Sequence, residues 1–164
     1  RANGITFVQG RLKIGVAMSP PLIRAVKEAM PREGMVILDA PPGTSCPVIA
    51  AVKGSDYVVL VTEATPFGLH DLTLAVDTVR QIGIPFGVII NRADLGDDRT
   101  RQYCAREEIP VLLEIQDDRR IAEAYSRGIP AVDALPEMRP LFIRLSETIR
   151  GLAATASGGK DRIG

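Results

Sequence analysis

The stretch that indicates the fold most specifically is Val36-Ile37-Leu38-Asp39-Ala40-Pro41-Pro42-Gly43-Thr44-Ser45-Cys46. A short, wholly apolar run such as 35–38 suits a strand that is buried on both faces of a parallel sheet. The carboxylate of Asp39 then lies at the rim of the sheet, where it can hold a hydrated Mg²⁺ together with substrate phosphates. An aspartate that only ends a strand and caps the next turn is the open alternative, and the Pro-Pro-Gly-Thr continuation favours the ligand-binding interpretation.

Short apolar runs alternate with amphipathic stretches on both sides of this segment. The alternation predicts βαβ units, and therefore an α/β fold with three layers: a mostly parallel sheet with helices on both faces. One domain over residues 1–156 and a flexible tail over 157–164 are expected. Ligands of such sheets bind beyond the carboxyl ends of the strands. The predicted strands are Leu12–Met18, Met35–Leu38, Tyr57–Thr62, Phe86–Ile90, Val111–Leu113 and, at the sheet edge, Ile129–Val132.

The composition excludes several classes of protein. Twenty basic residues balance twenty acidic ones, which argues against a general electrostatic attraction to nucleic acid or to an anionic membrane. No apolar run approaches the roughly 20 residues that a membrane span needs. Two cysteines, Cys46 and Cys104, are too few for a disulfide framework and have no metal-type spacing. A cytoplasmic protein is expected, and because the chain begins at Arg1 we expect it to be a piece of a longer one.

The segment around Asp39 resembles the Walker B and switch II region of P-loop ATPases of the MinD/ParA/Mrp class. The similarity covers roughly Leu12 to Ile149, and the details Pro42–Pro47 and Thr65–Asp71 resemble one subgroup in particular. Members of that subgroup are MinD-superfamily ATPases with an inserted ferredoxin-like iron–sulfur domain. Further stretches continue the resemblance in the same order: Val61–Leu72, Val88–Asp94 and Ile121–Pro130.

The resemblance implies roles at the phosphate end of a nucleotide. Asp39 is expected to be the Walker B aspartate, which contacts Mg²⁺ through a water molecule. Gly43 is expected to be the switch II glycine, whose amide senses the γ-phosphate. These two residues form the predicted catalytic set, while Pro41 and Pro42 shape the loop that binds the cofactor.

The resemblance also implies roles at the base end. Asn91 is expected to hydrogen-bond the edge of adenine, because its side chain offers both an acceptor and a two-proton donor. The loop from Glu114 to Asp117 is expected to border the base, and Arg92, Ile115 and Asp117 complete the predicted cofactor-binding set. The loop reads Glu114-Ile115-Gln116-Asp117 where the family usually has Ile-Pro.

One hallmark of the class is missing from the sequence. No stretch reads G-x-x-x-x-G-K-[ST], and the Gly158-Gly159-Lys160 of the tail lacks the following Ser or Thr and follows no predicted strand. We expect this loop, a switch I aspartate and a ferredoxin domain with a 4Fe–4S cluster to precede Arg1 in the intact protein. The chain alone is therefore expected to bind nucleotide poorly and to be inactive.

The predicted function is that of an ATP-driven switch. In the intact protein it would use ATP, ADP and Mg²⁺, act as a homodimer or with another protein partner, and couple to an iron–sulfur domain. A non-catalytic α/β protein-interaction module is the alternative. A phosphoacceptor receiver domain is a third interpretation, but it would need an acidic pair early in the chain and a lysine at a late strand end, and neither is found.

Overall fold

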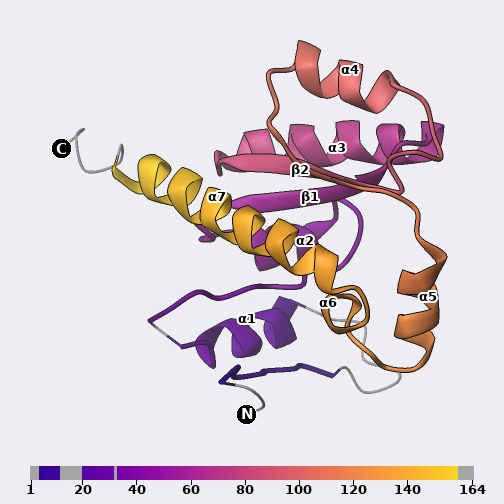
Figure 1. The fold of residues 1–164 in the computed structure, drawn as a ribbon. Coiled ribbons are helices and arrows are strands. Elements are labelled where there is room, and N and C mark those ends of the chain that lie inside the picture. The colour runs from indigo at the N-terminus through magenta and orange to yellow at the C-terminus, as the bar shows by residue number, and fades with distance from the viewer. Residues whose placement is uncertain (1–3, 12–19, 32, 159–164) are drawn as a thin grey trace. The chain divides into compact units, whose positions relative to one another are not determined.

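The computed structural model describes residues 4–11, 20–31 and 33–158, and it divides the chain into two compact units (Figure 1). The first unit is Arg1–Gly54 and the second is Ser55–Gly164. The strand predicted over residues 12–18 lies outside the described residues, as do residues 159–164 of the predicted tail.

The first unit contains two helices, α1 (Pro20–Glu28) and α2 (Cys46–Val52). The side chain of Lys27 on α1 donates hydrogen bonds to the carbonyl oxygens of Ala50, Ala51 and Lys53 at the end of α2. The last carbonyl groups of a helix have no partner within the helix, and a cation there is favoured by the helix dipole. Lys27 therefore joins the two helices by capping α2.

The strand predicted over residues 35–38 does not form in the described part of the unit. These residues belong to no β-ladder, and Ile37 is 84% exposed. A strand must pair its backbone N–H and C=O groups with those of a neighbouring strand. The described residues of this unit contain no strand that could serve as that neighbour. Hydrophobicity alone therefore predicted the wrong structure for this run.

The second unit is built on a parallel sheet in the order β1-β2-β3. The strands are β1 (Val58–Glu63), β2 (Phe86–Asn91) and β3 (Val111–Ile115). Helix α3 (Pro66–Ile82) connects β1 to β2, and α4 (Arg99–Arg106) connects β2 to β3. The α/β fold and three of the predicted strands are thus confirmed.

Four helical segments come after β3 in the chain: α5 (Arg119–Ser126), α6 (Ala131–Ala134), the 3-10 helix η1 (Pro136–Met138) and α7 (Arg139–Gly158). The prediction of a strand over 129–132 is wrong, because residues 129 and 130 belong to no strand and α6 begins at Ala131. Pro130 is the N-cap of α6, and its carbonyl accepts hydrogen bonds from the amides of Asp133 and Ala134. A proline has no N–H for a β-ladder, whereas its fixed φ suits a helix start.

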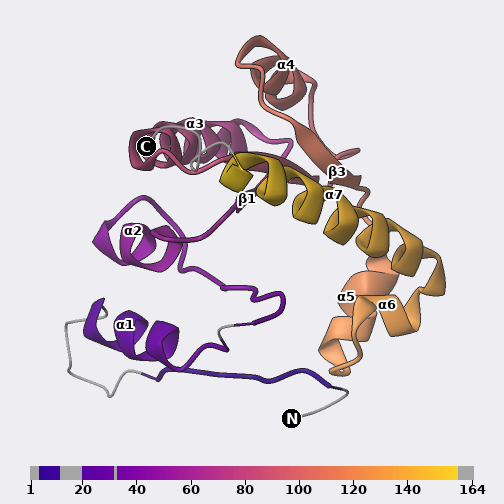
Figure 2. The same ribbon diagram turned by 90° about the vertical axis from the view of Figure 1, so that its left-hand side faces the viewer.

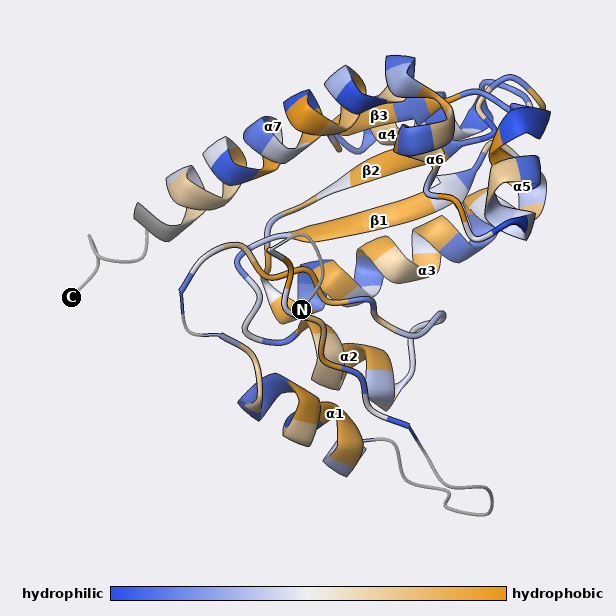
Figure 3. Ribbon diagram, turned by 60° about the horizontal axis from the view of Figure 1, so that its bottom comes forward, coloured by the Kyte–Doolittle hydropathy of each residue, from blue (hydrophilic) through white to orange (hydrophobic). Residues whose placement is uncertain are grey.

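The helices of the second unit lie on both faces of its sheet. Figures 1 and 2 show α3 and α4 on one face and α7 on the other. Figure 3 shows that β1 and β2 are almost uniformly hydrophobic, which is typical of strands in a parallel sheet. None of the described helices is both long and apolar enough to cross a membrane.

The core of this unit lies between β2 and the two helices α3 and α4. Leu72 and Val76, one helical turn apart on α3, share this core with Val88 and Ile90 of β2. Cys104 of α4 is buried in the same cluster, and this burial raises the pKa of its thiol.

Truncation of Ile90 tests this description of the core. Ile90 is fully buried, with 0% of its surface exposed, whereas Val61 of β1 is 66% exposed. Ile90→Ala should lower the free energy of unfolding by about 2–5 kcal/mol, because it removes buried methylene groups and leaves a cavity. Val61→Ala is the control and should change it by less than about 0.5 kcal/mol. Urea denaturation followed by circular dichroism measures both, and equal losses would contradict the assigned core.

Candidate functional site

Two of the site residues that the sequence singles out, Asn91 and Ile115, lie at one edge of the sheet. Asn91 is the last residue of β2 and lies opposite Glu63 of β1 and Ile115 of β3. The carboxyl ends of parallel strands are the usual place for a ligand in an open α/β sheet. Of the residues expected to border a base, Asn91 and Ile115 therefore lie on neighbouring strands.

A hollow of about 420 Å³ opens at this edge, which we call the carboxyl-edge hollow. It combines a side-chain amide, two hydroxyls and two carboxylates with two large apolar side chains. Such a mixture suits a small ligand with a flat apolar body and a few polar groups. The lining residues are Val61, Thr62, Glu63, Thr65, Phe67, Gly68, Asp71 and Asn91.

The first turn of α3 forms one wall of the carboxyl-edge hollow and is fixed to the end of β1. The hydroxyl of Thr65, the N-cap residue, accepts a hydrogen bond from the amide of Gly68 at 3.0 Å. The buried hydroxyl of Thr62 donates to the carbonyl of Gly68 at 2.8 Å. A Cβ at position 68 would overlap the carbonyl oxygen of Glu63, so this close approach requires glycine.

Arg92 follows Asn91 and links the ends of two strands. Its backbone is left-handed, with φ of 51°, which is uncommon for a residue other than glycine. Its Nε donates to Oδ1 of Asp117 at 2.9 Å, and its Nη1 lies 3.8 Å from Oε1 of Glu63. The side chains of Arg92 and Asp117 are 48% and 42% exposed, so this ion pair stands at the rim of the edge.

Asp94 makes a second connection to Asp117. Its Oδ1 accepts a hydrogen bond from the backbone amide of Asp117 at 2.6 Å. Between these residues, the amide of Ala93 donates to the carbonyl of Ile115 at 2.9 Å. The turn at residues 92–94 and the loop after β3, residues 115–118, are therefore held together by several contacts.

Arg101 of α4 connects this turn to β3 through hydrogen bonds. Its guanidinium donates two hydrogen bonds to the carboxylate of Glu114, at 2.9 and 2.7 Å, and one to the carbonyl of Ala93 at 2.9 Å. A bidentate pair of this kind fixes geometry as well as charge. The hydrogen bonds from Arg101 hold the pKa of Glu114 below its ordinary value.

The residues predicted for the phosphate end lie in the first unit. Asp39, Pro41, Pro42 and Gly43 are all exposed and precede α2, whose N-cap is Ser45. Gly43 has φ of 92°, a conformation that strongly favours glycine. The single carboxylate of Asp39 suits Mg²⁺, which is usually bound by one or two carboxylates with water and phosphate. Among the described residues, no three His, Cys, Asp or Glu side chains cluster to hold a metal ion.

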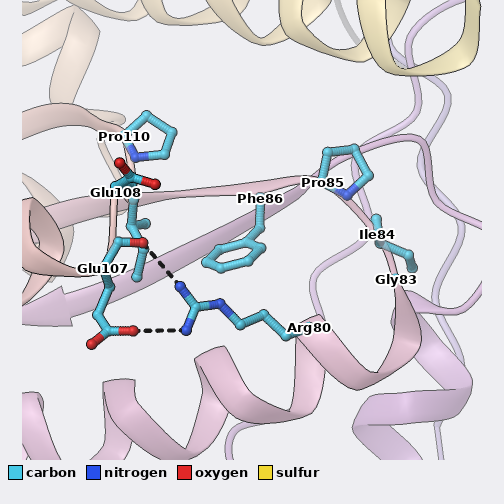
Figure 4. A pocket seen from close by; sticks show the side chains of 9 residues that line it. Arg80, Gly83, Ile84, Pro85, Phe86, Glu107, Glu108 and Pro110 are labelled. Carbon is cyan, nitrogen blue, oxygen red and sulfur yellow. Dashed lines mark hydrogen bonds and ion pairs between the residues drawn. The ribbon is translucent and has the colours of Figure 1, made fainter. Parts of the chain in front are cut away.

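A second hollow lies at the amino ends of β2 and β3, at the opposite end of the sheet (Figure 4). It has a volume of about 500 Å³, and its rim carries an ion pair in which Nη1 of Arg80 lies 2.9 Å from Oε2 of Glu107. Pro85 and Pro110 stand directly before the two strands. The sequence analysis did not single out this hollow, because its residues match no ligand-binding motif.

Sequence reasoning missed two residues of the carboxyl edge, Asp94 and Arg101. The signal for Asp94 was present, because it closes the stretch Asn91-Arg92-Ala93-Asp94 directly after a strand. Arg101 gave no signal: it lies on a charged helix, and its partner Glu114 is thirteen residues along the chain. The presence of an arginine on a charged helix does not predict which carboxylate it will contact in the fold.

The lowered pKa of Glu114 predicts a pH-dependent stability. A carboxyl group whose pKa is lowered by folding stabilises the protein when the pH is above the ordinary pKa of the group, which is 4.5 for a glutamate. This contribution is lost as the pH falls through the lowered pKa. Glu114→Gln should therefore lower Tm at neutral pH by a few degrees, and the difference from the wild type should shrink below pH 4.5. Glu147→Gln on the exposed side of α7 is the control. A Tm difference for Glu114→Gln that stays constant across the acid range would contradict the assignment.

Comparison with known proteins gives two curated relatives, and no model of a protein family matches the chain. Uncharacterized protein MJ0579 of Methanocaldococcus jannaschii is 34% identical over 92 residues, which cover 56% of this chain and 31% of that protein. Uncharacterized protein MJ0578 of the same organism is 24% identical over 96 residues, covering 57% and 35%. The chain thus spans about a third of the length of the curated relatives that it matches.

Among solved structures, the chain is similar to the cell division ATPase MinD of Pyrococcus furiosus. The TM-score is 0.63 and the identity 26%, and the match covers 81% of this chain and 57% of that chain. The resemblance noticed in the sequence is therefore confirmed at the level of the fold: the chain has a MinD-like P-loop fold.

Proposed function

We propose that this chain is part of the nucleotide-binding domain of an ATPase that works as an ATP-driven switch. The observation that carries the proposal is the carboxyl edge of a MinD-like sheet, where Glu63, Asn91 and Ile115 lie side by side next to a hollow. The chain spans 57% of the matched MinD chain, so the activity of the whole protein is part of the proposal.

At the base end, Asn91 binds the edge of adenine. Its side chain carries one acceptor and a two-proton donor, which complement the N7 acceptor and the N6 amino group of adenine. Ile115 offers an apolar contact to one border of the base, and Asp117 closes the loop beside it. The apolar side chain of Phe67 in the hollow, which is 85% exposed, adds a surface on which a flat ring can pack.

At the phosphate end, Asp39 holds Mg²⁺ through a water molecule, and the metal supplies charge neutralisation for the transferred phosphate. The positive φ of Gly43 supports a role for its amide, because a glycine lets the backbone approach the γ-phosphate closely. Pro41 and Pro42 restrict the loop that carries this amide. The sequence holds no Walker A loop, so the β- and γ-phosphates need a further segment for tight binding.

A protein partner or a second copy of the chain completes the proposed switch. Coupling to an iron–sulfur centre is proposed only through another protein or another part of the polypeptide. A cluster uses four ligands, commonly cysteines, whereas this sequence has two cysteines, and Cys104 is buried in the core.

A protein-interaction module without catalysis is the second candidate function. It is favoured by Val61 and Phe67, whose apolar side chains remain exposed in the carboxyl-edge hollow. Exposed apolar groups that lie together with polar groups around them are typical of protein contacts as well as of ligand sites. A measurement of nucleotide binding distinguishes the ATPase from the interaction module.

Calorimetric titration with Mg²⁺·ATP and Mg²⁺·ADP tests the proposal on two polypeptides: this chain, and one that extends it upstream through a glycine-rich phosphate loop. Only the extended form is expected to bind tightly. In that form Asp39→Ala should lower metal affinity or ATP turnover by about 10- to 100-fold, the usual cost of losing a group that acts on a metal through its outer shell.

Asp56→Ala is the matched control, because Asp56 is an exposed aspartate outside the proposed site. This variant should retain the turnover of the unmodified protein. If neither polypeptide binds nucleotide, the ATPase proposal fails and the interaction module becomes the better description. If Asp39→Ala and Asp56→Ala lose activity equally, the assignment of Asp39 fails.

A further inference from the structure

Hydrogen bonds connect the turn at residues 92–94 to the loop after β3 (residues 115–118). Asp117 is engaged twice, since its carboxylate accepts from Nε of Arg92 at 2.9 Å and its amide donates to Oδ1 of Asp94 at 2.6 Å. The backbone bond from Ala93 to Ile115, at 2.9 Å, lies between them. These three hydrogen bonds tie the loop to the turn.

The turn itself is anchored on its far side. Ala93 is buried, and its carbonyl accepts from Nη2 of Arg101, which is bound in turn to Glu114 of β3. A left-handed residue other than glycine persists only where its surroundings over-determine it. Arg92 meets that condition, and its strained backbone directs the guanidinium to Asp117 and Glu63.

This arrangement has a chemical consequence for a base bound beside Asn91. A free carboxylate only accepts hydrogen bonds, and guanine presents donors on N1 and N2, whereas adenine presents one donor group on N6 and ring acceptors. The guanidinium of Arg92 takes up one acceptor site on Oδ1 of Asp117 and places a positive charge beside the carboxylate, and Asp94 engages the amide of Asp117. The loop therefore offers less to the donor edge of guanine than an unpaired Asp117 would.

We infer that Arg92 and Asp94 are positioning residues that fix the loop after β3 beside Asn91 and thereby set a preference for adenine over guanine nucleotides. The inference rests on the proposed function and names the part of that site that selects the base. It assigns Arg92 to the loop, in contrast to the direct nucleotide contact that the sequence predicts.

The first test uses this chain without nucleotide. Amide hydrogen exchange should show the amide of Asp117 exchanging about two- to tenfold faster in Asp94→Ala, which is the effect of losing one hydrogen bond. Asp94→Asn keeps a side-chain oxygen at the same place and should restore the protection. Unchanged exchange of Val88 and Ile90 in β2 shows that the variants remain folded. Equal exchange of Asp117 in all three proteins would overturn the inference.

The second test measures base selectivity in the nucleotide-binding polypeptide. The Kd values of ATP, GTP and inorganic tripolyphosphate are compared for the unmodified protein, Arg92→Ala and Arg92→Lys. Arg92→Ala should reduce the preference for ATP over GTP about two- to fivefold, the range of a half-exposed ion pair, and leave tripolyphosphate binding unchanged. Arg92→Lys should retain part of the preference because it keeps the charge. Arg106→Ala, whose arginine pairs with Glu107 at the opposite end of the sheet, is the control.

The outcomes separate this inference from the proposed function. If the unmodified protein binds no nucleotide, both the proposed function and this inference fail. If it binds ATP and Arg92→Ala leaves the ATP-to-GTP ratio unchanged, the proposed function stands and the inference fails. If Arg92→Ala weakens ATP, GTP and tripolyphosphate equally, Arg92 only stabilises the fold, which also overturns the inference.

Discussion

The second unit depends on the parallel pairing of β2 between β1 and β3. Val88 and Ile90 of β2 are wholly buried, so the register of this strand is fixed by packing on α3 and α4 as well as by its hydrogen bonds. The same register puts Asn91 opposite Glu63 and Ile115. A hydrophobic constraint in the middle of the sheet therefore determines which polar groups meet at its edge.

The charges around that edge are largely satisfied within the protein. Arg92 is paired with Asp117, and Arg101 with Glu114 and Asp98. Arginines that are already committed to carboxylates offer little to the charge of a phosphate, whereas the amide of Asn91 suits an uncharged base. This division favours the proposed role of this edge as the base end of a nucleotide site.

Much of the second unit follows from local sequence patterns, because its strands are short apolar runs and α3 has a helical apolar stripe with Thr65 and Gly83 at its ends. The pattern failed at residues 35–38 and 129–132, where pairing partners and Pro130 decide the outcome. In the site, the adjacency of Asn91 and Ile115 was predictable from strand order. The contacts of Arg92 and Asp94 with Asp117 were not, since they join residues 25 and 23 positions apart and depend on a left-handed φ.

The central claim is that the carboxyl edge of this sheet binds an adenine base. Its most direct test is a titration of the isotope-labelled chain with adenosine, followed by backbone amide NMR, because adenosine carries no phosphate and needs no Walker A loop. The account predicts that the amides of Asn91 and Asp117 shift while that of Glu108, beside the hollow at the amino ends, does not, and that guanosine produces smaller shifts. Shifts centred on Glu108, or equal shifts with adenosine and guanosine, would contradict it.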